Sequence, residues 1–179
     1  GLSTRPTRKL YDERGQPVAA TDLDAIVANA NTATIPATQT PRYGLVVRRA
    51  DLRTFPTRTR VFSSNDDHDI DRFQESALFP GTPVAFMHGS NDGKWWFVVS
   101  PRYAAWVPRD AVAEGTREQV LGYGSRTPYR IVTGAEIQTV HTRERPQVSQ
   151  LQLDMGVRLP LADVPPDQPV NGQHPYTSW

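Results

Sequence analysis

The apolar positions of this chain gather into short runs near its middle, and turn-forming residues separate these runs. The clearest runs are 43–47, 82–88, 94–100 and 105–108. They are rich in aromatic and β-branched side chains, and the glycine- and asparagine-containing segment 89–93 is typical of a tight turn. Short strands at such close spacing predict a mainly β fold, with a small barrel over residues 43–114.

The segment before this block, residues 1–42, is polar and lacks a dense apolar pattern. Within it, Leu23, Ile26 and Val27 recur at helical spacing, which predicts one short helix over residues 21–29. The threonine- and proline-rich sequence after the helix indicates an extended linker. We therefore expect an irregular N-terminal arm with one short helix, which packs on the rest of the protein.

A second β-rich stretch occupies part of residues 115–179. Residues 129–134 and 136–140 predict a β-hairpin, and residues 149–154 alternate between apolar and polar side chains. From Val164 onward the sequence is rich in proline and has no period. A second barrel of the first one's size needs more sequence than this, so we expect an incomplete second domain.

Composition excludes several classes of function. The formal net charge is +1, which lacks the field that non-specific binding to nucleic acid requires. No window approaches 18 apolar residues, so no membrane span is predicted. The chain has no cysteine, which excludes disulfides, thiolate catalysis and cysteine-based zinc sites. The sequence also has no Walker loop, no His-Glu-x-x-His and no Gly-x-Ser-x-Gly, so we expect no cofactor and no catalytic residue within it.

An acidic segment is the one pattern that suggests a metal. It contains Asp66, Asp67, His68, Asp69 and Asp71. It lacks the glycine and the terminal glutamate of a calcium loop, so the segment is interpreted as a solvated acidic loop and no metal site is predicted.

Four aromatic residues are the remaining candidates for chemistry or binding. Trp95 and Trp96 are adjacent in a predicted strand, so their side chains point to opposite faces. One is expected in the core, and the other at an interface or a ligand. Tyr103 lies in a predicted loop, where ligand contact and turn packing are both open. Trp106 lies in a short apolar strand and is expected in the barrel core.

Several separated blocks of the central region resemble the first bacterial SH3 (SH3b) domain of NlpC-family cell-wall peptidases. These blocks are 43–57 (YGLVVRRADLRTFPT), 69–78 (DIDRFQESAL), 81–84 (GTPV), 90–95 (SNDGKW) and 103–108 (YAAWVP). They occur in the order found in that family. Residues 155–160 (MGVRLP) resemble, less strongly, part of the family's second SH3 domain, and residues 10–40 resemble the end of its N-terminal stabilising segment. The resemblance therefore implies an arm over 1–42, a first SH3 domain over 43–114 and a second SH3-like domain over 115–179.

Members of this family are γ-D-glutamyl-L-diamino-acid endopeptidases that cleave peptidoglycan stem peptides in the cell envelope, either periplasmic or secreted. They join two SH3-like barrels to a papain-like domain with a Cys-His-His triad. Since this chain has no cysteine, the resemblance implies a non-catalytic SH3b portion. Such a portion restricts or positions the cell-wall peptide for the papain-like domain of the same protein. The alternative is a stand-alone SH3 module that binds the cell wall or a protein.

The resemblance also implies site residues. In the family, an acidic residue and a tyrosine of the first SH3 domain help to bind the free amino end of the peptide. Glu75 and Tyr103 match these positions, and a carboxylate satisfies an ammonium group through charge-assisted hydrogen bonds. Trp96 is the third candidate substrate-binding residue, because one of the two adjacent tryptophans is expected at a surface.

Overall fold

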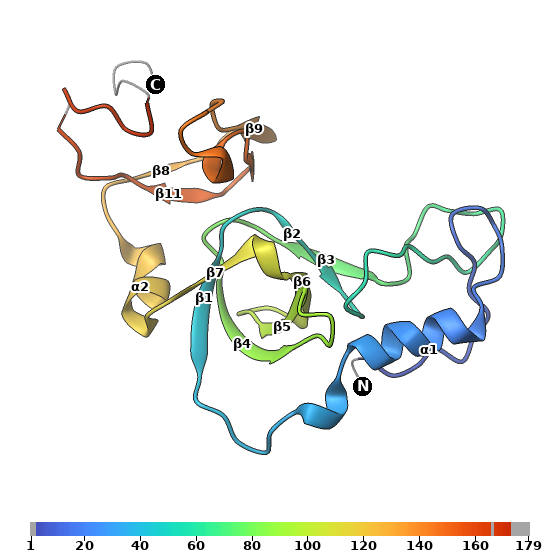
Figure 1. The fold of residues 1–179 in the computed structure, drawn as a ribbon. Helices are drawn as coiled ribbons and strands as arrows, with labels where there is room; N and C mark the ends of the chain where they lie inside the picture. Colours follow the sequence, from blue (N-terminus) through green and yellow to red (C-terminus); the bar gives the residue numbers. More distant parts are fainter. Residues whose placement is uncertain (1–2, 166, 173–179) are drawn as a thin grey trace.

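The computed structural model describes residues 3–165 and 167–172, and its main element in these residues is a seven-stranded antiparallel sheet. The strand order is β3-β2-β6-β5-β4-β1-β7. The bounds are β1 (Arg42–Val46), β2 (Ala50–Arg53), β3 (Gln74–Leu78), β4 (Pro83–Gly89), β5 (Trp95–Val99), β6 (Ala104–Pro108) and β7 (Val112–Gly115). The sheet curls into a small barrel, which confirms the mainly β, SH3-like fold expected from the sequence (Figure 1).

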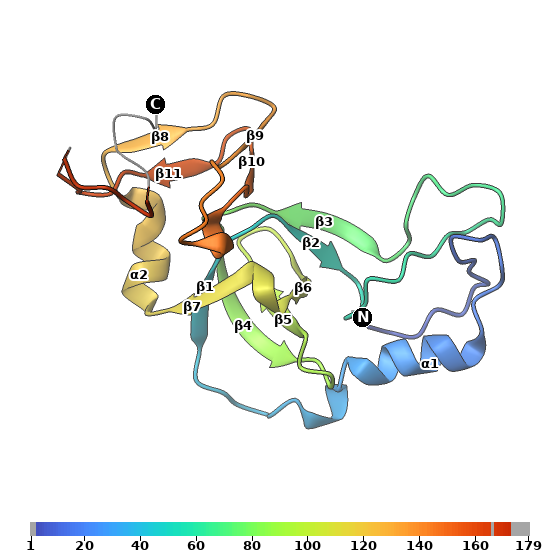
Figure 2. The ribbon, with the colours of Figure 1, turned by 45° about the horizontal axis from the view of Figure 1, so that its top comes forward.

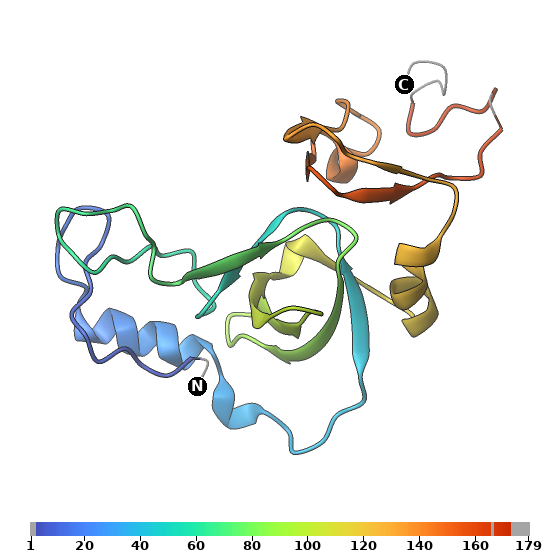
Figure 3. The same cartoon turned by 180° about the vertical axis from the view of Figure 1, so that it is seen from behind.

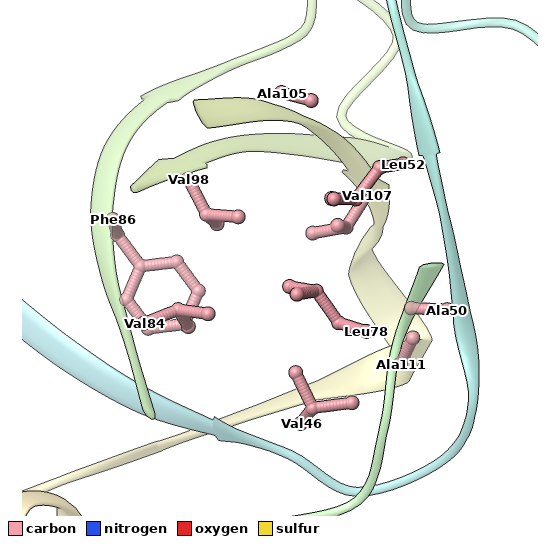
Figure 4. Packing of buried hydrophobic residues seen from close by; sticks show 10 residues of the cluster. All are labelled: Val46, Ala50, Leu52, Leu78, Val84, Phe86, Val98, Ala105, Val107 and Ala111. Carbon is pink, nitrogen blue, oxygen red and sulfur yellow. The ribbon is translucent and has the colours of Figure 1, made fainter. Parts of the chain in front are cut away.

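The barrel interior is filled by alternate residues of several strands. In β4, Val84 and Phe86 are buried while Met87 is exposed, as the two-residue period of a strand requires. In β6, Ala105 and Val107 point into the same core. Figure 4 shows these side chains converging from strands on opposite sides of the barrel. Burial of this continuous apolar cluster is the main force that closes the sheet.

The N-terminal arm packs on the outside of the barrel. Its helix α1 (Ala20–Asn29) begins one residue before the predicted helix, and a short 3₁₀ turn, η1 (Thr32–Thr34), follows it. Leu23 is buried against Phe55 and Phe73, in the long connection between β2 and β3 and at its end. The predicted helix and its apolar face are therefore confirmed.

A second apolar cluster lies between the arm and the outer surface of the sheet. Trp106 is 2% exposed and packs with Trp95, Ala30 and Phe97. Its indole Nε1 donates a hydrogen bond to Ser3 Oγ at 3.0 Å. Trp106 is buried as expected, but its predicted place in the barrel core is wrong. Its neighbours in β6 point inward, so the strand period directs the indole outward, under the arm.

A histidine fastens the end of the arm helix to the sheet. Nε2 of His88, in β4, lies 3.1 Å from the carbonyl oxygen of Ala30 and 2.9 Å from that of Asn31. Since both partners are acceptors, Nε2 carries the proton. The His88 and Trp106 rings also pack in a T-shaped arrangement, with 6.1 Å between ring centroids. This contact joins β4 to the point where the arm turns away toward β1.

The chain after the barrel forms a separate, smaller layer. It contains α2 (Arg117–Gly122), η3 (Tyr123–Ser125), β8 (Tyr129–Ile131), β9 (Glu136–Gln138), η4 (Pro146–Val148), β10 (Gln152–Asp154) and β11 (Arg158–Pro160), whereas η2 (Arg109–Ala111) belongs to the barrel and joins β6 to β7. Helix α2 leads from β7 to the ribbon of β8 and β11, which lies away from α1, across the barrel (Figures 2 and 3).

The predicted hairpin in this layer is wrong, because β8 and β9 do not pair with each other. β8 pairs with β11 and β9 pairs with β10, all antiparallel. The strands come together because Val132, Leu153 and Val157 are buried against one another, with Leu159 beside them. The backbone N–H of Val132 also donates to Val157 O at 3.0 Å, so the two short ladders continue each other as one interrupted ribbon.

Candidate functional site

Two of the three predicted site residues meet in a direct hydrogen bond. Tyr103 Oη donates to Glu75 Oε2 at 2.6 Å, and Thr54 Oγ1 donates to the other carboxylate oxygen, Oε1, at 2.6 Å. Glu75 belongs to β3, Thr54 directly follows β2, and Tyr103 directly precedes β6. Because β2 pairs with both β3 and β6, residues distant in sequence become neighbours on one surface.

A tight turn fixes the tyrosine. Ser100 Oγ donates to Tyr103 O at 2.8 Å and accepts from the backbone N–H of Tyr103 at 3.1 Å. The backbone N–H of Ser100 also donates to Tyr103 O, at 2.8 Å. The turn therefore fixes the backbone of Tyr103, and the hydrogen bond to the Glu75 carboxylate fixes the position of its hydroxyl group.

Two hydrogen bonds hold the carboxylate of Glu75, but no cation among the described residues neutralises its charge. Within residues 3–165 and 167–172, Glu75 forms no ion pair, and its side chain is exposed. Each carboxylate oxygen has lone-pair capacity beyond the one hydroxyl donor it receives. The hydrogen bond to Glu75 raises the pKa of Tyr103, with smaller contributions from desolvation and from the carboxylate charge. The phenol therefore remains a donor, and the pair presents an oriented anion to solvent.

Trp96 lies elsewhere. It is half-buried at the opposite end of β5 from the turn that carries Tyr103, and its ring forms a T-shaped contact with Phe86 at 5.3 Å between ring centroids. The guanidinium groups of Arg109 and Arg42 lie 4.5 Å and 5.1 Å from its ring centroid. The structure does not bring Trp96 to the Glu75–Tyr103 pair, and its role as a ligand contact stays a prediction.

The adjacent tryptophan takes the other face, as the strand period requires. Trp95 is buried with Trp106 under the arm, while Trp96 contacts the edge of the barrel core. Trp95 is therefore buried under the arm and not in the barrel core, which corrects the expected place of the inward tryptophan, while the half-buried Trp96 stays the candidate for an interface or a ligand. The arm supplies the cover for Trp95 through Ala30.

A groove beside Tyr103 is a feature that the sequence did not indicate. It has a volume of about 740 Å³ and lies between the barrel and the C-terminal ribbon. Phe79 and Tyr103 line it from the barrel, and Tyr123 and Met155 line it from the later layer. No local pattern predicts such a groove, because its walls come from several separate segments between residues 52 and 158. A larger groove of about 1190 Å³, between α1 and the turn before β5, contains none of the predicted site residues.

The acidic segment is partly structural rather than fully solvated. The side chain of Asp71 is 8% exposed and pairs with the buried guanidinium of Arg53 at 2.5 Å. Asp71 Oδ1 also accepts from the backbone N–H groups of Val61 and Phe73. Over the described part of the chain, no group of three or more histidine, aspartate or glutamate side chains is placed to hold a metal ion. In the same residues, the helices are too short or too polar to cross a membrane.

Comparison with known proteins identifies the barrel. Residues 60–108 match the family model of the SH3 domain of the SH3b1 type. The chain contains an SH3 domain of the SH3b1 type. This SH3b1 match includes Glu75, Trp96 and Tyr103, and it confirms the resemblance to a bacterial SH3 domain.

Solved structures extend the likeness beyond the SH3b1 domain. The chain is similar to a structure described as a novel NlpC/P60 endopeptidase from Photobacterium damselae subsp. piscicida, with a TM-score of 0.75 and 23% sequence identity. The match covers 88% of this chain and 35% of that protein, so this chain spans about a third of the length of its structural relative. At this identity the likeness shows the fold. A search of curated proteins gave no match.

Proposed function

We propose that this chain is the non-catalytic SH3b portion of a peptidoglycan endopeptidase of the cell envelope. In this proposal residues 43–114 are a first SH3 domain, residues 115–179 part of a second, and residues 1–42 an arm that stabilises the first. The portion positions a stem peptide for a papain-like catalytic domain of the same protein. The similarity to an NlpC/P60 endopeptidase over 88% of the chain supports this assignment.

The observation that carries the proposal is the paired side chains of Glu75 and Tyr103. A carboxylate that receives two hydroxyl donors is fixed in one orientation, so little side-chain entropy is lost when a cation binds. Within the described residues it has no ion-pair partner of its own. An ammonium group has three donors and matches the free lone pairs of such a carboxylate. The exposed ring of Tyr103 then forms a wall beside the first residue of the peptide.

The proposal is tested by titrating the isotopically labelled chain with a stem-peptide fragment and following amide chemical shifts. The fragment is used with a free amino terminus and in N-acetylated form. We expect shifts around β3 and the turn before Tyr103 with the free amine, and weaker binding after acetylation. Glu75→Gln keeps the shape and removes the charge, so it should weaken binding of the free-amine fragment roughly 3- to 10-fold at low salt, with little effect on the acetylated one.

Glu118→Gln provides the matched control, because it removes another exposed carboxylate, in the first turn of α2. Equal losses for both fragments in Glu75→Gln would contradict amine recognition and leave Glu75 a structural role. Binding of intact peptidoglycan without any dependence on the free amine would favour the stand-alone binding module instead.

A further inference from the structure

The groove beside Tyr103 carries a net positive charge on its walls. Two arginines line it, Arg102 from the barrel and Arg158 from β11, and none of its described lining residues is acidic. Three acidic residues directly precede lining residues along the chain. Asp51 and Asp154 each lie 3.7 Å from the guanidinium of Arg49, and Glu75 is the carboxylate of the proposed amine site. The two arginines therefore have no acidic partner in the lining itself, and the Glu75 carboxylate lies at the Tyr103 end of the groove.

Arg158 is a cation with unused donors. Its guanidinium stacks on the ring of Tyr129, at 3.5 Å from the ring centroid, and Nη2 donates to the carbonyl oxygen of Arg126 at 2.9 Å. The Nε atom is buried and has no hydrogen-bond partner among the described residues. Stacking and one hydrogen bond hold the group in place, yet no carboxylate of the described chain pairs with it. A planar guanidinium fixed in this way is suited to a carboxylate ligand.

Arg102 faces the same groove from the other wall. It lies in the Ser100–Tyr103 turn, directly beside the proposed amine site, and its side chain is exposed. Like Arg158, it forms no ion pair with any residue that the structure describes. The site therefore has a carboxylate at Glu75 and two cations in the groove that begins at Tyr103.

We propose that this groove is an anion subsite, in which Arg102 and Arg158 bind the carboxylate of an acidic peptide whose amino terminus lies on Glu75 and Tyr103. The amine end of this arrangement rests on the proposed function above. The alternation of charge, negative at Glu75 and positive in the groove, complements a ligand that begins with an ammonium group and continues with a carboxylate. The apolar walls, Phe79 among them, cover the backbone and methylene groups between the two charges.

The subsite also gives the C-terminal ribbon a role in binding. Arg158 belongs to β11, whereas Glu75 and Tyr103 belong to the barrel. The ring of Tyr123 packs against Gly81, where an added Cβ atom would lie 2.7 Å from it, and its hydroxyl donates to Arg158 O at 3.3 Å. Contact between the two layers therefore positions the arginine, and ligand recognition requires both of them.

The test uses a set of four tripeptide amides that vary the amino-terminal charge and the pair of side-chain carboxylates independently. They are Ala-Glu-Glu and Ala-Gln-Gln, each with a free or an acetylated amino terminus, and binding to the whole chain is measured from amide chemical shifts. We expect the acidic free-amine peptide to bind roughly 3- to 10-fold more tightly than its glutamine counterpart at low salt. Arg102→Gln and Arg158→Gln should each reduce this preference while the preference for a free amine persists.

Arg72→Gln is the control, because it removes one exposed arginine charge outside the groove. It measures how much affinity for an acidic peptide is lost when the net charge of the protein falls by one. If the arginine variants lose affinity equally for the glutamate and glutamine peptides, the anion subsite is wrong. Equal affinity of the wild-type chain for the two peptides overturns it as well. Should Arg158→Gln unfold the ribbon, Arg102→Gln decides, since that side chain is exposed in a turn. Loss of the amine preference alone would overturn the proposed function and leave the subsite standing.

Discussion

Replacing Trp106 with alanine tests how firmly the arm is attached to the barrel. The indole is 2% exposed, packs between the sheet and Ala30, and donates its Nε1–H to Ser3. Removing a fully buried aromatic side chain costs about 3–5 kcal/mol. The total stability of a domain is about 5–15 kcal/mol, so we expect a large fall in the urea midpoint. Trp106→Phe retains a ring but loses the hydrogen bond, which contributes about 1 kcal/mol. Its urea midpoint should therefore lie between those of the wild-type chain and Trp106→Ala.

Unfolding should be followed by far-ultraviolet circular dichroism, because the substitution removes a fluorophore. Tyr103→Ala is a suitable control, since that ring is 40% exposed and its loss should cost much less. An unchanged midpoint in Trp106→Ala, with an unchanged slope, would refute the burial of this indole beneath the arm. A lower midpoint in Trp106→Ala that Trp106→Phe fully restores would show that packing, and not the bond to Ser3, holds the arm.

The other predictions concern charge, titration, backbone space and activity. Asp71→Asn leaves Arg53 as a buried, uncompensated cation and should cost about 3–5 kcal/mol in urea unfolding, against little change for an exposed aspartate. In an ultraviolet titration, the phenol of Tyr103 should ionise at higher pH in the wild-type chain than in Glu75→Gln, because the hydrogen bond to Glu75 raises the pKa of Tyr103. The stabilisation by this hydrogen bond is therefore present below pH ~10 and is lost as the pH rises through the folded-state pKa. Gly44→Ala should cost about 1–3 kcal/mol, since its Cβ would lie 2.6 Å from a core phenylalanine ring, and a wild-type melting temperature would contradict this. The chain alone should release no peptide from peptidoglycan, because its sequence contains no cysteine nucleophile.

The sequence predicted those strands whose apolar pattern is dense. The runs that became β4, β5 and β6 are rich in valine and aromatic residues, and the structure places strands there. The strands β2 and β3 were not predicted. β3 contains Gln74, Glu75 and Ser76 in an edge strand, where backbone pairing to β2 rather than side-chain burial fixes the conformation. Side-chain pattern carries no signal for a strand of that kind.

The candidate site was predictable only in part, for a geometric reason. The resemblance to SH3b domains suggested Glu75 and Tyr103, but their contact depends on β2 lying between β3 and β6. The alternation rule gave opposite faces to the two tryptophans, yet it could not say that the arm would cover one of them. The arginine-lined groove depends on how the second layer packs against the barrel, and the sequence misassigned the strand pairing inside that layer, so Arg158 had no reason to be selected.

The contacts of Trp106 also determine when the arm can acquire its final structure during synthesis. Ser3 and Trp106 are separated by 103 positions along the chain, and Ala30 must likewise wait for the same indole. A ribosome has therefore to deliver nearly the whole barrel before Ser3 and Ala30 can make these contacts. Contacts of such high sequence separation close late and slowly. Until then α1 has only its contacts with Phe55 and Phe73, and this nascent stage is where the protein is most open to chaperones or to association with other chains.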